Sequence, residues 1–143
     1  LEAAMIKGPV YVTAEHDFLW ADTATGQMTL QGTYVEAGWW LTGEGRRYNA
    51  GTGGLVPVAP RRSVQDGGFG AVAIVARYDH VDLTNQNLGT RAGRVDAVSV
   101  GVSWMPVDYV TFRLAASQNR YSGPNVGNNG AAQVIMARAQ LSF

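Results

Sequence analysis

The sequence of 143 residues contains no cysteine, only two histidines and no long apolar run. Without cysteine, disulfides, thiolate metal sites and thiol catalysis are excluded. A transmembrane helix needs roughly 18 or more consecutive apolar residues, so a helical membrane protein is excluded as well. The formal net charge is zero, which gives no long-range attraction to nucleic acid. We therefore expect no nucleic-acid partner, and no pattern in the sequence predicts a cofactor or a metal.

What the sequence does contain is typical of strands and turns, with 18 glycines and four tryptophans. In one segment Val98, Val100 and Val102 alternate with Ser99 and Gly101, the period of a strand with one apolar face. Residues 105–108, which include a proline, are predicted to form a tight turn after it. Strands of about ten to fifteen residues, each bounded by Gly, Asn, Asp or Pro, are predicted over residues 9–20, 28–42, 69–83, 95–105, 108–119 and 131–143.

This alternation fits a soluble antiparallel sandwich as well as a membrane barrel. Two features favour the barrel. The segments exceed the usual five or six residues of a strand and suit a tilted span of roughly 30 Å. Aromatic residues also lie near the segment ends, where an interfacial girdle is expected: Trp20, Trp39, Trp40, Tyr78, Trp104, Tyr109 and Phe143. The prediction is an all-β, antiparallel transmembrane β-barrel.

Six strands cannot close a barrel, because the smallest single-chain examples have roughly eight and an open edge in lipid leaves backbone groups unpaired. We therefore interpret residues 1–143 as the C-terminal portion of one barrel domain. Phe143 ends the last alternating segment and is expected to be an assembly signal for the barrel-insertion machinery. That places the C-terminus in the periplasm, with 84–94 and 120–130 as outward loops and the long connection 43–68 on the periplasmic side.

The charged residues of the polar faces are the candidates for a pore lining, since charges cost little against a wet lumen. The basic candidates are Arg77, Arg113 and Arg138, and the acidic ones are Glu15, Asp17, Glu36 and Asp79. Three basic against four acidic residues predict no clear anion preference for this part of the wall. Selectivity is then expected to depend on other parts of the protein or on local clustering.

Two other functions remain as alternatives. A barrel with an enzymatic, non-transport role needs a nucleophile with a positioned base. Only His16 and His80 are available as histidine bases, and the sequence has no Gly-x-Ser-x-Gly turn, so we expect no enzyme activity. A soluble β-sandwich binding module would instead use Trp39 and Trp40 on a ligand face.

Several short motifs, in order, resemble the phosphate-selective porin O and P family. The segment 38–44 followed by Arg46, Arg47 and Tyr48 is similar to the family's TGE-R-Y motif. The others span nearly the whole chain, at residues 8–15, 70–78, 81–83, 100–104 and 138–143. The chain departs from the family at Val72 and Ala73, where a Trp and a Glu are common, and at Met105, where an aromatic is common.

The resemblance implies a homotrimer of barrels of about sixteen strands each, in the outer membrane of a Gram-negative bacterium and in contact with membrane lipid and lipopolysaccharide. Such a porin passes small anions such as phosphate by diffusion along a lumen with basic side chains. The family's selectivity loop belongs to an earlier half of the barrel that this sequence does not contain. The resemblance therefore carries over the barrel more firmly than the preference for phosphate.

Overall fold

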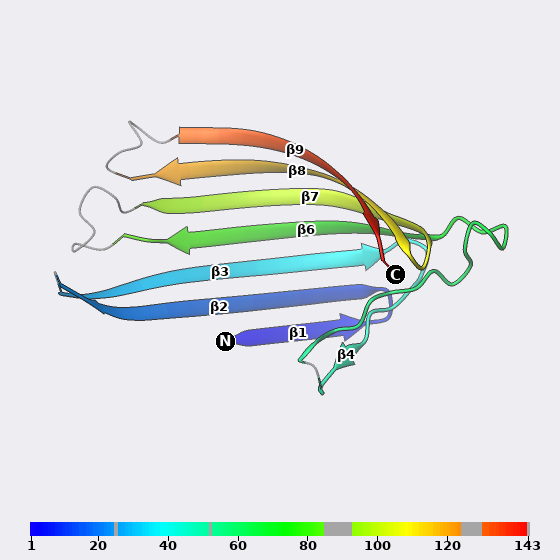
Figure 1. Ribbon diagram of the computed structural model, residues 1–143, viewed down its shortest axis with the longest axis horizontal. Coiled ribbons are helices and arrows are strands. Elements are labelled where there is room, and N and C mark those ends of the chain that lie inside the picture. Colours follow the sequence, from blue (N-terminus) through cyan, green and yellow to red (C-terminus); the bar gives the residue numbers. More distant parts are fainter. Residues whose placement is uncertain (25, 52, 85–92, 124–129, 143) are drawn as a thin grey trace.

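The computed structural model describes residues 1–24, 26–51, 53–84, 93–123 and 130–142. No helix in this part of the chain is long and apolar enough to cross a membrane. The strands are β1 (Glu2–Lys7), β2 (Val10–Thr23), β3 (Gly26–Trp40), β4 (Tyr48–Asn49), β5 (Gly54–Leu55), β6 (Ala71–Asp82), β7 (Arg94–Val107), β8 (Val110–Ser122) and β9 (Gly130–Leu141). They form a seven-stranded sheet in the order β1-β2-β3-β6-β7-β8-β9 and a two-stranded sheet of β4 and β5 (Figure 1).

Every neighbouring pair of strands is antiparallel, which confirms the all-β antiparallel fold class. All six predicted strands are present, and the sequence reading missed β1 and the β4–β5 hairpin. The residues of β1, EAAMIK, include Glu, Ala and Lys, which are depleted in strands. This strand forms because the turn at Gly8 and Pro9 folds it back onto β2, with Gly8 at a positive φ of 57° that a two-residue hairpin turn requires.

The main sheet is open at both sides. Within the described residues β1 pairs only with β2, and β9 pairs only with β8. The turn between β1 and β2, the connection between β3 and β6, and the turn between β7 and β8 share one end of the sheet with Leu141 (Figure 1). Phe143, the expected assembly signal, lies outside the described residues, as do most residues of the expected loops 84–94 and 120–130.

The long strands have the reach that a membrane span requires. β7 has 14 residues, and at about 3.3 Å per residue it extends roughly 46 Å along its own axis. A strand tilted by about 40° then rises roughly 35 Å, which exceeds a hydrocarbon core of about 30 Å. The lengths are therefore those of barrel strands.

The turn predicted at residues 105–108 was wrong in position. β7 continues to Val107, and only Asp108 and Tyr109 form the turn to β8. The register shifts between Trp104 and Val107, which places one extra residue on β7. Pro106 lies in this irregularity because a proline cannot donate to a strand ladder and is confined to edges and bulges. Its carbonyl accepts a hydrogen bond from the Val64 N–H at 2.9 Å.

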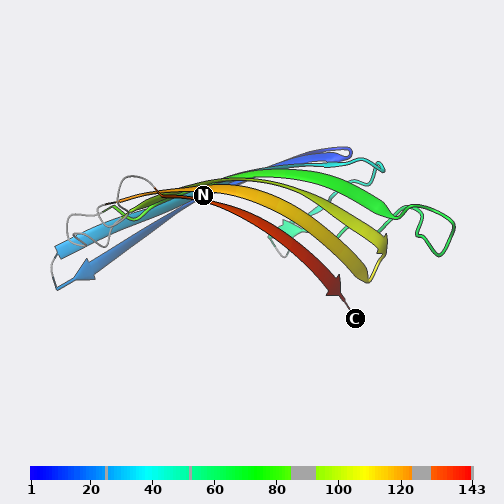
Figure 2. The ribbon, with the colours of Figure 1, turned by 90° about the horizontal axis from the view of Figure 1, so that it is seen from above.

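The main sheet has two faces of different chemistry, because residues opposite each other in register point the same way. One face contains Tyr11, Glu36, Arg77, Ser99, Arg113 and Arg138; the other contains Val12, Trp39, Ile74, Val100, Leu114 and Ile135. Figure 2 shows the sheet as an arch with β4 beneath it. The connection carrying β4 and β5 borders a cavity with Arg77, Ser99 and Arg113, so the face with the charges is the concave one.

The convex face is apolar over the half of the sheet nearest the connection. Its exposed side chains there include Trp39, Ile74, Val100, Val102, Trp104, Phe112, Leu114, Ile135 and Leu141. A soluble protein rarely leaves so many neighbouring apolar side chains in water. The arrangement therefore favours a lipid-facing surface over the soluble sandwich.

The aromatic side chains fall on both faces. Trp39 and Trp104 lie on the convex face near the strand ends, and the Trp104 indole N–H donates to the Phe69 carbonyl at 2.7 Å. Trp20 lies on the same face at the opposite end and stacks on Phe18 with ring centroids 5.4 Å apart. Trp40, expected in the girdle, instead lies on the concave face and is buried, because adjacent strand residues point to opposite faces.

Candidate functional site

The concave face collects all of the charged residues that the sequence predicted for a pore lining. Glu36 is opposite Arg77, and Arg113 is opposite Arg138. Strand alternation places the others on the same face. The set is Glu15, Asp17, Glu36, Arg77, Asp79, Arg113 and Arg138. The geometry brings them onto one surface; that they line a pore stays a prediction.

The acidic members and Arg77 form one group on β2, β3 and β6. Arg77 bonds to Asp79 at 2.7 Å and lies 3.7 Å from Glu36. Its guanidinium also covers the Tyr34 ring at 3.8 Å, a favourable cation–π arrangement. Glu15 is opposite Tyr34 in register. The positive charge of Arg77 is therefore largely compensated by its neighbours.

Arg113 and Arg138 form a separate basic group on β8 and β9. They are exposed and directly opposite each other, an arrangement that repels unless water or an anion screens it. Neither has a carboxylate within 4 Å among the residues that the structure describes. The acidic and basic residues are therefore separated across the concave face. Although the candidate lining residues comprise three basic and four acidic side chains, the part of the face on β8 and β9 is locally positive.

The connection between β3 and β6 packs against this face. Trp40, 4% exposed, forms a small core with Ala71 and Ala73, and Val58 of the connection and Met105 pack against it. The departure from the family pattern at Ala73 has a structural consequence here, because a small side chain at this position lies in the core beside the Trp40 indole.

Glu44 fastens the connection at its base. Its side chain is 3% exposed, accepts a hydrogen bond from the Thr42 hydroxyl and accepts another from the Arg61 backbone N–H at 3.1 Å. The Thr42 oxygen in turn accepts from the Val72 N–H at 2.9 Å. A buried carboxylate is tolerated only with such partners. These bonds tie the start of the connection, its later part and β6 together.

Arg46 extends from the connection to the wall of the concave face. Its guanidinium carbon lies 4.3 Å from the centre of the Tyr11 ring, a cation–π distance. Tyr11 is 1% exposed, and its hydroxyl donates to Glu36 at 2.8 Å. Arg46 is thus held against the same surface that carries the predicted lining residues.

Tyr11, Trp40, Glu44 and Arg46 were missed as site residues by the sequence reading. Strand alternation puts Tyr11 and Trp40 on the same side as Glu15 and Glu36 but does not show what covers them. Arg46 and Glu44 belong to the family-like motif, yet they lie outside any strand, where periodicity gives no direction. Only the path of the connection shows that Arg46 reaches the concave face and that Glu44 is buried at the base of the connection.

Gly38 gives a direct test of the Tyr11 arrangement. It is opposite Tyr11 in register, and a Cβ at this position would overlap ring atoms of Tyr11. Gly38→Ala is therefore expected to displace the ring, to break its bond to Glu36 and to destabilise the folded protein by about 1–3 kcal/mol. Equilibrium unfolding in urea measures this change.

Gly32→Ala is the matched control for Gly38→Ala. Gly32 lies on the same strand and the same face, and a Cβ there would meet nothing within 4 Å. We expect its stability to stay within about 0.5 kcal/mol of the unchanged protein. Equal loss of stability in both variants would contradict the role given to Tyr11.

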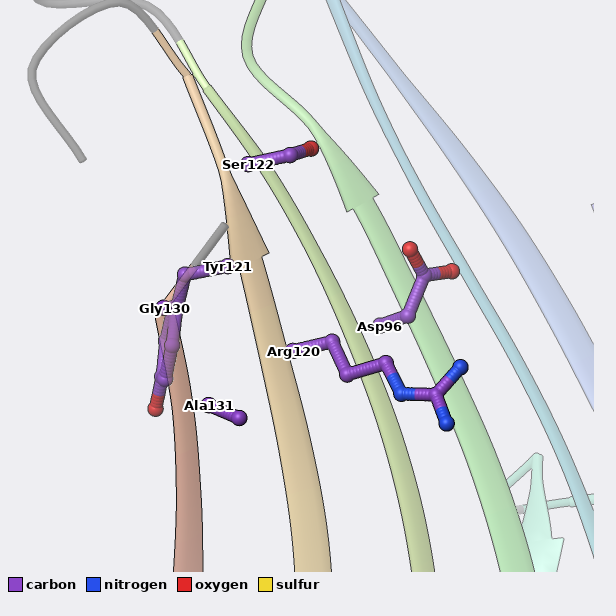
Figure 3. Close-up of a pocket in the computed structure, with 6 residues that line it drawn as sticks. All are labelled: Asp96, Arg120, Tyr121, Ser122, Gly130 and Ala131. Atoms are coloured by element: carbon purple, nitrogen blue, oxygen red, sulfur yellow. The ribbon is translucent and has the colours of Figure 1, made fainter. Parts of the chain in front are cut away.

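A second cavity of about 420 Å³ lies at the opposite end of the sheet. It is lined by Asp96, Arg120, Tyr121, Ser122, Gly130 and Ala131. Figure 3 shows the Arg120 side chain extending toward Asp96, its partner in register on β7. The convex face is polar at this end of the sheet, because Asp96 accepts a hydrogen bond from the Tyr78 hydroxyl at 2.6 Å and contacts His80 at 2.8 Å. The apolar part of the convex face therefore ends here.

Each of the two histidines contacts one polar side chain of a neighbouring strand. His16 and His80 lie on the convex face, on either side of Thr33 in register. His16 contacts the Thr33 hydroxyl at 2.5 Å, and His80 contacts Asp96. Within the described residues no group of three or more His, Cys, Asp or Glu side chains could hold a metal ion.

Comparison with known proteins agrees with the geometry. The sequence model of the family described as phosphate-selective porin O and P matches residues 1–143. An uncharacterized protein from Caulobacter vibrioides is 33% identical over 148 residues, an alignment that covers all of this chain and 29% of the relative. The chain thus spans less than a third of the length of that curated relative.

Proposed function

Because the chain belongs to the phosphate-selective porin O and P family, we propose that it forms part of the wall of a water-filled channel for the diffusion of small ions and solutes. Membership confirms the resemblance found in the sequence. Membership in a porin family supports a channel rather than an enzyme, and it implies the bacterial outer membrane.

The observation that carries this proposal is the division of the curved sheet into two faces. Apolar side chains such as Val100 and Leu114 are exposed on the convex face, whereas Arg77, Arg113 and Arg138 share the concave one. In a barrel the outer face contacts lipid and the inner face contacts water. A curved sheet with its charges inside and its apolar residues outside fits that requirement.

Closing the channel requires strands beyond the seven. An unpaired strand edge in lipid leaves backbone groups without partners, and β1 and β9 each present such an edge within the described residues. We propose that these seven strands are the C-terminal portion of one barrel of about sixteen strands, as such barrels have 8 to 26 or more. On this view the connection end of the sheet faces the periplasm.

The remaining partners follow from the same proposal. The convex face contacts membrane lipid and, toward the end with Arg120 and Asp96, the lipopolysaccharide of a Gram-negative outer membrane. Phe143 would serve as the signal for the barrel-assembly machinery. The complete protein would assemble as a homotrimer and pass small anions such as phosphate.

Ion selectivity tests the pore-lining residues directly. In the complete barrel reconstituted in planar bilayers, Arg113→Ala and Arg138→Ala are expected to lower the preference for anions, because each removes a fixed positive charge from the channel wall. The reversal potential in a potassium chloride gradient measures the change. The proposal is wrong for these residues if neither variant alters ion preference or conductance.

Arg120→Ala provides the matched control for this test. Arg120 lies on the same strand as Arg113 but on the convex face. The substitution Arg120→Ala removes the same charge without changing the lumen, so the reversal potential is expected to stay at its original value. A shift as large as that of Arg113→Ala would show that the two faces are assigned the wrong way round.

A further inference from the structure

The connection between β3 and β6 forms one side of a cavity on the concave face, and the sheet forms the other. The cavity measures about 540 Å³. Sites for small organic molecules in proteins typically measure roughly 300–1,000 Å³. Figure 2 shows β4, which belongs to this connection, on the concave side of the arch. The cavity therefore has the size of a site for an organic solute.

Much of the lining of this cavity is apolar. The connection contributes residues 55–58, which are Leu, Val, Pro and Val, and the sheet contributes Trp40, Val75 and Met105. An apolar group that leaves water for such a surface is stabilised by the hydrophobic effect, whereas an inorganic ion gains nothing from it. Pockets for organic molecules have this composition, with a mainly apolar lining and a few polar groups that fix orientation.

Trp40 adds a hydrogen-bond donor to the lining. Its side chain is 4% exposed, and its indole N–H is buried without a hydrogen-bond partner among the residues that the structure describes. A buried tryptophan usually finds a partner for this N–H, because an unpaired buried donor is costly. An acceptor oxygen of a bound molecule would supply the partner.

The lining also carries charges of both signs. They are Glu36, Arg46, Arg77, Asp108 and Arg113. Glu36 and Arg77 compensate each other at 3.7 Å. In the part of the chain that the structure describes, no oppositely charged side chain lies within 4 Å of Arg46, Arg113 or Asp108. Cationic and anionic groups are therefore both available to a ligand.

We propose that this cavity binds small organic zwitterions with an apolar side chain, the chemistry of a free aromatic or branched amino acid. The inference rests on the proposed channel function and names a class of solute for it. It concerns molecules with an apolar body and two opposite charges, in place of simple inorganic ions.

Each part of such a molecule matches a part of the lining. The apolar side chain packs beside Trp40 and Met105. The carboxylate accepts hydrogen bonds from the indole N–H or from Arg46, whose guanidinium is already held against the Tyr11 ring. The ammonium group is attracted by Asp108. A plain anion would be repelled by Asp108 and would leave the apolar lining unused.

A series of four probes tests the proposal on the unchanged complete barrel in planar bilayers. L-phenylalanine has all three features, glycine lacks the ring, phenylacetate lacks the ammonium group and phenethylamine lacks the carboxylate. L-phenylalanine is expected to halve the potassium chloride current at a concentration about tenfold or more below that of each other probe, because each lacks one contact. Equal potency of phenylacetate would mean a plain anion site and would overturn the proposal.

Asp108→Asn tests the contact with the ammonium group. The half-blocking concentration of L-phenylalanine is expected to rise about fivefold, whereas that of phenylacetate should not rise. Asp22→Asn is the matched control, because Asp22 is exposed at the opposite end of β2 and does not line the cavity. An equal rise in both variants would overturn the site, since the effect would then reflect overall charge.

Trp40→Phe tests the indole N–H, because the substitution keeps a ring in the core and removes the donor. Block by L-phenylalanine should weaken about fivefold. Trp39→Phe, on the convex face, should leave the block unchanged. Asp108 is exposed in the turn between β7 and β8, so its variant decides the question if Trp40→Phe assembles poorly.

The outcomes separate the inference from the proposed function. If the unchanged complete protein forms no channel, the proposed channel function itself fails. If it forms channels that L-phenylalanine blocks no better than glycine, only the zwitterion site fails. Unchanged block in both Asp108→Asn and Trp40→Phe would also overturn the site, because the solute would then bind elsewhere in the channel.

Discussion

Replacing Val100 by arginine is expected to destabilise the folded protein in its membrane by about 2–4 kcal/mol. Val100 is 53% exposed on the convex face, between Ala76 and Ala116 in register. A charged side chain there would enter the hydrocarbon, and its small neighbours offer no polar partner. The cost is largest near the middle of the bilayer and small at the interfaces.

Urea unfolding of the protein in lipid, followed by the heat-modifiable shift in gel migration, measures this loss. Ser117→Arg is the control, since Ser117 lies on the neighbouring strand and on the concave face beside Ser99. Its new charge would face water, so we expect at most about 1 kcal/mol of change. If Val100→Arg were tolerated as well as Ser117→Arg, the convex face would not contact lipid.

The faces of the long strands could be predicted from the sequence because a period of two fixes them once one residue is placed. Arg77, Arg113 and Arg138 were assigned to one surface on this basis, and the register confirms that they share it. Their neighbours could not be predicted. Sequence alternation does not show that Arg77 is compensated by Asp79 while Arg113 has no acidic partner within 4 Å in the described part of the chain.

The parts that the sequence left open are those where the chain leaves the strand period. Pro106 was placed in a turn because proline is common there, but a bulge accommodates it equally well. The connection between β3 and β6 has no periodicity, so its direction depends on long-range contacts such as Val58 against Trp40. A connection this long in a compact protein is usually functional or mobile, and its path over the concave face supplies a reason for its length.

The adjacent tryptophans show how this path is fixed. Trp39 is 54% exposed on the convex face, whereas Trp40 is 4% exposed beneath the connection. Both were assigned to an interfacial girdle because both are aromatic and near a strand end. Alternation alone requires that one of them point inward, and the inward one needs a cover. The connection is that cover, so the core around Trp40 holds the segment that carries Arg46.

Trp40→Ala is therefore expected to be the most damaging substitution of the concave face. Removing a buried tryptophan side chain costs about 3–5 kcal/mol through lost packing and the cavity left behind. The substitution removes the contacts of Trp40 with Ala71, Ala73 and Val58. The connection should then detach from the wall, and trypsin should cleave it faster at Arg47 and Arg62.

Trp39→Ala supplies the comparison, because it removes the same side chain one residue away. Its indole contacts lipid on our assignment, so about 1 kcal/mol or less should be lost, and the rate of cleavage in the connection should not change. Digestion of both variants in lipid, followed by mass analysis of the fragments, separates the two expectations. Faster cleavage of Trp39→Ala, or protection of the connection in Trp40→Ala, would show that the Trp40 core does not hold it. The contact of Arg46 with the Tyr11 ring would then depend on other parts of the connection.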